Sequence, residues 1–61
     1  MSRMTLDNMV HFVETKMNAD SAVVLAKEYH PKMPENGTRY IEVAMVADLG
    51  TFVLEVKEAS A

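Results

Sequence analysis

The sequence predicts an α+β fold in which one amphipathic N-terminal helix packs on a three-stranded antiparallel β-meander. Two observations predict it. Apolar residues recur with helical spacing in the first third of the chain, and the last third alternates apolar and polar residues around a glycine turn. The chain has 61 residues, the size of one domain. We therefore expect residues 1–61 to form a single small α+β domain.

The first element is a helix over about residues 5–17. Thr5 can cap its amino end through the side-chain hydroxyl, and Asp7 in the first turn suits the positive pole of the helix dipole. Asn18 tolerates the left-handed conformation that ends many helices, so it is the expected stop. The apolar stripe follows the spacing i, i+3, i+4, i+7 and i+11, and consists of Leu6, Met9, Val10, Val13 and Met17.

The last third predicts a β-hairpin. Residues 40–47 and 52–57 are rich in β-branched and aromatic side chains, which favour strands. The interval between them, residues 48–51, contains Gly50, which can adopt the positive φ that tight turns need.

The middle segment, residues 22–30, fits two structures. As a helix it would be capped by Asp20 or Ser21 and stopped by Pro31, and as a strand it offers the pair Val23-Val24. A two-stranded hairpin is only marginally stable in water, whereas three strands under a helix can form a domain. We therefore predict a strand and the order α-β-β-β, with α-α-β-β as the alternative.

Residues 25–31 (LAKEYHP) resemble the J-domain family of co-chaperones. In that family such a stretch ends the second helix and opens a loop with a His-Pro-Asp tripeptide, which stimulates the ATPase of the chaperone partner. His30 and Pro31 match, but Lys32 occupies the aspartate position and reverses its charge. The resemblance covers about a tenth of the chain and implies a helical middle segment. Because the functional aspartate is missing, we interpret the resemblance as a chance match.

Composition limits the classes of partner. Six Lys and Arg against nine Asp and Glu give a net charge of −3, and the basic residues are scattered singly, so a nucleic-acid partner is not expected. No apolar run approaches the roughly 20 residues of a membrane span, so no membrane is expected either. The first residues lead straight into an amphipathic pattern unlike a signal peptide, and we expect a cytoplasmic location.

The residues also give little basis for chemistry. There is no cysteine, which excludes disulfides and thiolate metal sites. His11 and Glu14 have the i, i+3 spacing of paired metal ligands, but two ligands do not make a site. Nothing has the spacing of a catalytic triad or the glycines of a phosphate loop. We expect neither enzymatic activity nor a cofactor or metal.

One helix can cover only one face of a three-stranded sheet. If the strands alternate without interruption, the covered face carries Val23, Leu25, Tyr29, Ile41, Val43, Met45, Phe52, Leu54 and Val56.

The opposite face is then more apolar than a solvated sheet face usually is, and its small alanines allow close approach of another chain. We expect this face to bind a protein partner. The predicted partner-binding residues are Val24, Ala26, Tyr40, Glu42, Ala44, Val46, Val53 and Glu55.

These expectations combine into one functional hypothesis. The chain is a small acidic protein-interaction module that binds and regulates or inhibits a larger cytosolic protein, in the manner of phage or mobile-element inhibitors of a host enzyme or defence complex. A homodimer is also expected, because a chain this short buries only about 60% of its unfolded surface and gains stability from association. In the simplest version two copies pack through the uncovered sheet face, and in a second version an edge strand adds to a partner's sheet. The alternative is a nucleic-acid-associated accessory protein acting as a homodimer, with a weak basic surface formed by Arg3, Lys27, Arg39 and Lys57.

Overall fold

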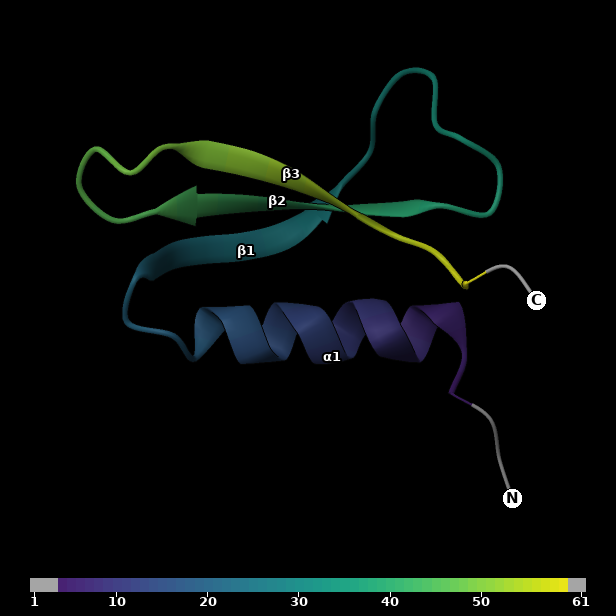
Figure 1. The fold of residues 1–61 in the computed structure, drawn as a ribbon, viewed down its shortest axis with the longest axis horizontal. Helices are drawn as coiled ribbons and strands as arrows, with labels where there is room; N and C mark the ends of the chain where they lie inside the picture. The colour runs from purple at the N-terminus through teal and green to yellow at the C-terminus, as the bar shows by residue number, and fades with distance from the viewer. Residues whose placement is uncertain (1–3, 60–61) are drawn as a thin grey trace.

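The computed structural model describes residues 4–59 and contains one helix followed by three strands. Helix α1 spans Leu6–Asn18, and the strands are β1 (Val23–Tyr29), β2 (Arg39–Met45) and β3 (Thr51–Val56). The helix lies along one side of the sheet (Figure 1). The predicted α-β-β-β order is confirmed. Because the middle segment is a strand, the α-α-β-β alternative is wrong, and so is the helix that the J-domain resemblance implied.

Helix α1 begins as its sequence predicts and ends differently. The Asn8 N–H donates to the Thr5 hydroxyl at 3.1 Å, so Thr5 is the N-cap. At the other end the helix runs through Asn18, and the C-cap Ala19 is right-handed, with φ −83° and ψ −11°. The expectation that Asn18 stops the helix in a left-handed conformation is therefore wrong. The side chain of Asn18 instead forms hydrogen bonds with the backbone of Ala26 in β1.

The three strands form an antiparallel meander in the order β1-β2-β3, with β2 in the centre. The central strand supplies the middle of the core, because Ile41 is fully buried and Val43 is 2% exposed. Val10 of α1 and Ala26 of β1 complete the buried cluster. The partly buried side chains packed around this cluster are Val13, Met17, Val23, Met45, Leu54 and Val56.

A β-bulge in β1 changes which residues face the helix. Val23 lies opposite Met45 and Leu25 lies opposite Ala44, so Val24 is one extra residue on the β1 side. An extra residue reverses the facing of every later side chain in the strand.

The bulge corrects three of the predicted positions. Ala26, expected on the uncovered face, is 3% exposed and lies in the core. Leu25 and Tyr29, expected beneath the helix, face the other side and are 48% and 39% exposed. Uninterrupted alternation from Val23 onward was the wrong assumption.

Both glycines sit in turns at positive φ. Gly50 precedes β3 with φ 102°, as the hairpin prediction requires, and its carbonyl accepts from the Met45 N–H at 2.9 Å. Gly37 has φ 79° in a turn closed by a hydrogen bond from the Thr38 N–H to the Glu35 carbonyl at 3.1 Å.

The helix does not cover the sheet evenly. It contacts β1 most and β3 least, and Figure 1 shows β3 as the strand farthest from α1 over most of its length. As a result Phe52 of β3 is 54% exposed, although its register partner Val43 is buried.

Deleting Val24 tests the bulge. Without this residue Val23 would pair with Met45 and Leu25 with Ala44 in a regular ladder, and every other side chain would keep its face. We expect the variant to fold with a melting temperature close to that of the parent. Deleting Ala26, which lies in the core, should abolish the cooperative thermal unfolding transition. A Val24 deletion that unfolds the chain in thermal denaturation followed by circular dichroism would contradict the assigned register.

Candidate functional site

The candidate site is the side of the sheet that α1 does not cover, called here the open face. Its members follow from the register and from the burial of their neighbours on the helix side. The open face comprises Leu25, Lys27 and Tyr29 of β1, Tyr40, Glu42 and Ala44 of β2, and Thr51, Val53 and Glu55 of β3.

The structure places five of the eight predicted partner-binding residues on the open face: Tyr40, Glu42, Ala44, Val53 and Glu55. Ala26 is in the core, as described above. Val24 is the bulge residue and is 65% exposed. Val46 follows β2, is half-buried, and donates its N–H to the Ala22 carbonyl at 3.0 Å.

The open face gains four residues that sequence reasoning put elsewhere or left out, namely Leu25, Lys27, Tyr29 and Thr51. Leu25 and Tyr29 bring large side chains that are partly exposed, and Lys27 lies between them on β1. No signal in the sequence marks the bulge, because the pair Val23-Val24 favours a strand at either facing.

Cross-strand rows give the open face its chemistry. At one end Tyr29 lies opposite Tyr40, and in the middle Lys27 lies opposite Glu42, so opposite charges are neighbours. Val53 continues the middle row and is 49% exposed. The result is a surface of aromatic and aliphatic side chains crossed by a few charges. Its tyrosines are of a type enriched at protein-binding surfaces.

A hollow of about 320 Å³ adjoins the open face where β1 ends and β2 begins. Its apolar lining comes from Tyr29, Tyr40, Pro31 and Pro34. The Tyr40 hydroxyl accepts a hydrogen bond from the Glu35 N–H at 2.9 Å, which holds the β1–β2 loop beside the hollow. The hollow therefore lies directly beside the tyrosine pair of the open face.

The side-chain amide of Asn18 fixes α1 to the sheet. Its Oδ1 accepts from the Ala26 N–H, and its Nδ2 donates to the Ala26 carbonyl, both at 2.8 Å. The same Nδ2 donates to the Glu14 carbonyl at 2.9 Å. One amide thus satisfies both backbone groups of Ala26 in the way a neighbouring strand would, and holds the last turn of α1 against β1.

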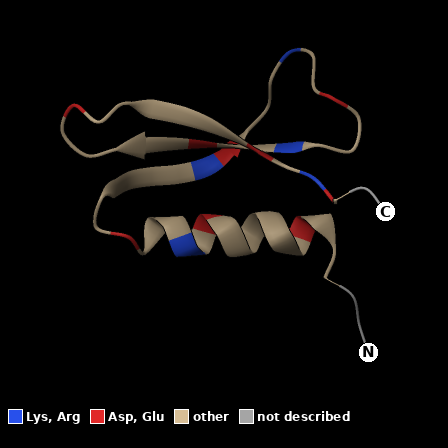
Figure 2. Cartoon of the chain, viewed as in Figure 1, with Lys and Arg blue, Asp and Glu red and all other residues tan. Residues whose placement is uncertain are grey.

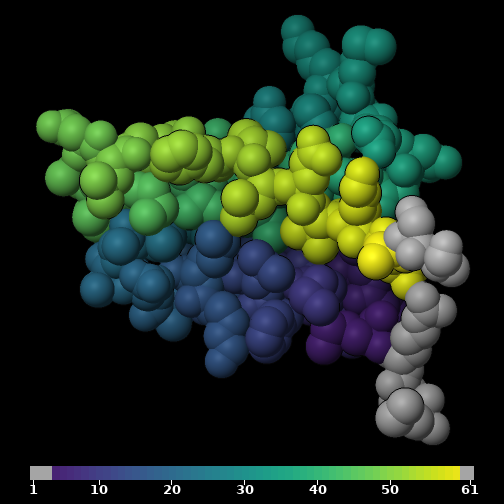
Figure 3. Space-filling view, in the orientation of Figure 1, coloured from purple at the N-terminus to yellow at the C-terminus, as the bar shows by residue number. Residues whose placement is uncertain are grey.

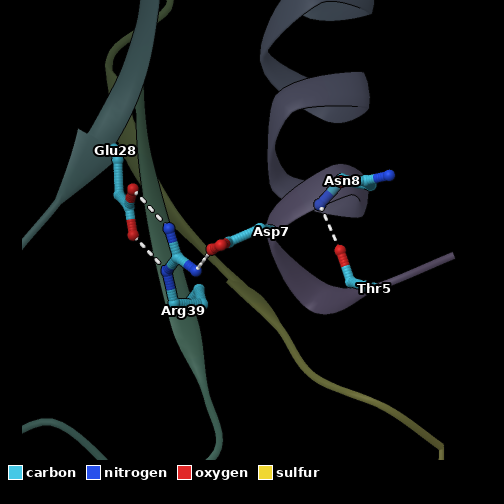
Figure 4. A network of polar contacts seen from close by, with 5 residues as sticks. All are labelled: Thr5, Asp7, Asn8, Glu28 and Arg39. Atoms are coloured by element: carbon cyan, nitrogen blue, oxygen red, sulfur yellow. Dashed lines mark hydrogen bonds and ion pairs between the residues drawn. The ribbon is translucent and has the colours of Figure 1, made fainter.

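An ion-pair network fixes the other end of α1. Arg39 of β2 binds Glu28 of β1 with two hydrogen bonds, one of them from Nη2 to Oε1 at 2.8 Å, and its Nη1 contacts Asp7 of α1 (Figure 4). The hydrogen bond from Arg39, opposed by desolvation, lowers the pKa of the Glu28 carboxyl below its ordinary value of 4.5. The same bond to Glu28, followed by the bond to Asp7, raises the pKa of Arg39.

The described residues contain no cluster suited to metal chemistry, since no three of their His, Asp or Glu side chains come together. Within residues 4–59, no helix has the length and hydropathy needed to cross a membrane. Comparisons with protein-family models, curated proteins and solved structures give no match to this chain. Function is therefore inferred from the surface of the molecule alone.

Asn18→Ala tests the amide link. The substitution leaves the partly buried N–H and carbonyl of Ala26 without their partner, so we expect a loss of about 1–3 kcal/mol in the free energy of unfolding. Asn8→Ala is the matched control on the exposed side of the same helix, and should be neutral or slightly stabilising because alanine favours helices. Urea denaturation of the parent and both variants measures these free energies of unfolding. Equal stabilities would show that the amide adds nothing.

The network predicts a pH dependence with a definite sign. Because the pKa of Glu28 is lower in the folded state, its contribution to stability is present above its unfolded pKa and is lost as the pH falls through the folded value. Between about pH 5 and pH 2, the free energy of unfolding of the parent should therefore fall more steeply than that of Glu28→Gln. Parallel curves from urea titrations across this range would rule out the assigned role of Glu28.

Proposed function

We propose that this chain is a small acidic interaction module that binds a larger cytosolic protein through the open face and thereby regulates or inhibits it. Binding, not catalysis, is its mode of action. The observation that carries the proposal is the exposure of Leu25, Tyr29 and Val53 together on one sheet face that no other described element covers.

Three features of the open face support a protein partner. Aromatic residues are enriched where binding energy concentrates, and Tyr29 and Tyr40 form a cross-strand pair beside the hollow. Ala44 near the other end of the face allows close approach of a flat surface. Lys27 and Glu42 lie opposite each other, so a partner covering the middle row would meet neighbouring opposite charges instead of an isolated one.

The charge pattern does not favour the nucleic-acid alternative. Arg39 is held by Glu28 and Asp7, and the Lys57 ammonium lies 3.6 Å from a Glu35 oxygen. Figure 2 shows acidic and basic segments interspersed over the described chain. At Arg39 and Lys57, a phosphate backbone would meet cations that already have acidic partners.

An inhibitor from a phage or mobile element is the form of this proposal that size and acidity suggest. Such a protein would work by occupying a surface that its larger partner needs.

Leu25→Asp tests the open face. A carboxylate at this half-exposed position would be desolvated by any partner, so capture of that partner should weaken by at least about tenfold. Leu49→Asp makes the same change in the β2–β3 turn, where Leu49 is 57% exposed, and should leave capture unchanged.

The measurement is quantitative mass spectrometry of proteins retained from the native cell's lysate by the parent and the two variants. Support requires a protein retained by the parent and by Leu49→Asp but lost with Leu25→Asp. Retention of the same proteins by all three, or retention of nucleic acid in a salt-sensitive manner, would overturn the proposal.

A further inference from the structure

The two edges of the sheet differ in how their backbone groups are satisfied. On the β1 edge, Asn18 satisfies both the N–H and the carbonyl of Ala26 at 2.8 Å, and the bulge at Val24 interrupts the strand. A bulge and a covering side chain both blunt an edge against pairing with another chain. The β1 edge is therefore protected.

The β3 edge carries no such protection. The Met45 N–H donates to the Gly50 carbonyl at 2.9 Å, so these two residues occupy a hydrogen-bonded position at the start of the β2–β3 ladder. Because such pairs alternate along an antiparallel ladder, Phe52, Leu54 and Val56 direct their backbone groups toward β2. The intervening residues, Thr51, Val53 and Glu55, direct theirs outward.

The outward groups of β3 are free in the described structure. Among residues 4–59, no hydrogen bond beyond the β2–β3 ladder reaches the backbone of Thr51, Val53 or Glu55. Figure 3 shows β3, in yellow-green, at the surface of the visible face without another described element over it. Within Thr51–Val56 there is no proline, no bulge and no lysine, the devices that keep edge strands apart.

Uncovered side chains accompany the uncovered backbone. On the helix side Phe52 is 54% exposed because α1 reaches β3 least, and Leu54 is only partly buried. An element added beside β3 on this side would cover both. The β3 edge thus offers a row of hydrogen-bonding groups next to an apolar strip.

The sequence of β3 is complementary to itself when one copy runs antiparallel to another. Residues directly opposite each other must share a face, and pairing Leu54 with Leu54 of a second copy sets Phe52 against Val56 of that copy. Aromatic and β-branched residues form favourable cross-strand pairs. All three helix-side residues of β3 then have apolar partners.

Charge selects the same register. Glu55 is the only charged residue within β3, and here it lies opposite Val53 of the second copy. If one copy slid by two residues so that the two-fold axis fell at Glu55, Glu55 would lie against Glu55 of the second copy, which is destabilising. A shift of two the other way would set Val56 against Gly50 and lose one apolar pair.

We propose that two copies of this chain associate through β3 in this register, around a two-fold axis at Leu54. The two three-stranded sheets then form one continuous six-stranded sheet, with both helices on the same side and both open faces on the other. Val53 and Glu55 of the two copies exchange the new N–H···O=C bonds. Pairing one short strand buries less than the about 1,200 Å² of standard interfaces, so the dimer has a dissociation constant in the micromolar range or weaker.

Single-cysteine variants report the register, because the chain has no cysteine of its own. Leu54 and its copy form a non-hydrogen-bonded pair with Cα atoms about 4.5 Å apart, within disulfide reach. Leu54→Cys should give a cross-linked dimer under mild oxidation. In Val53→Cys the two cysteines would lie diagonally across the strand pair, with Cα atoms more than about 7 Å apart, so this variant should stay monomeric on a denaturing gel. Cross-linking through Val53→Cys and not Leu54→Cys would overturn this register.

Val53→Pro tests edge pairing without breaking the fold. Its N–H points outward, so proline removes a donor to the second copy and none to β2. In sedimentation equilibrium up to about 1 mM, the parent and Val53→Thr should dimerise, and Val53→Pro should weaken the dimer by at least about tenfold. Circular dichroism verifies that each variant is folded. A monomeric parent over this range, or equal dimerisation of folded Val53→Pro, would reject the proposal. Leu25→Asp should dimerise like the parent, which separates this result from that for the open face.

Discussion

The amide of Asn18 holds the end of α1 against the backbone of Ala26, and this pair of hydrogen bonds governs the arrangement of the two layers. It joins the last turn of α1 to β1. It requires that the backbone of Ala26 face outward at the sheet edge while its small side chain lies beneath the helix. The bulge at Val24 is what gives Ala26 that facing. At the other end of α1, the contact of Asp7 with Arg39 keeps the helix along the same strands.

Because the helix lies over β1, side chains of β3 at the opposite edge of the sheet stay exposed. A single helix cannot also cover β3, so Phe52 is left more than half exposed while Ile41 in the centre is fully buried. The sheet therefore has one edge protected by a side chain of its own molecule and one edge bare. A 61-residue chain has no further described element to cover either the bare edge or the open face.

These two surfaces have different chemistry, and we propose a different partner for each. The open face carries tyrosines, aliphatic side chains and adjacent opposite charges, which fit a structured protein surface. The β3 edge offers backbone groups and an apolar strip whose order matches its own reverse, which fits a second copy. Edge pairing would set two open faces side by side on one continuous sheet. A larger partner could then meet either one face or both, and two-site binding would strengthen attachment without any new contact.

Local sequence was sufficient for the elements and their order. The apolar stripe, the Thr5 cap and the turn at Gly50 are short-range signals, and the structure confirms the helix, the hairpin and the α-β-β-β order that they predict. The choice of strand for the middle segment also came from the sequence, through the weakness of an isolated hairpin. Five open-face positions on β2 and β3 follow from alternation alone, because those strands pair without interruption.

The facing of β1 was decided only by tertiary structure. Val23 and Val24 have equal preference for a strand, so nothing local determines which of them pairs with Met45 and which is the extra residue. That choice depends on residues about twenty positions away on β2 and on an amide from α1, and it moved Ala26 into the core and Leu25 and Tyr29 onto the open face. Side-chain alternation has a period of two, so one residue inserted by long-range pairing exchanges the two faces of a strand.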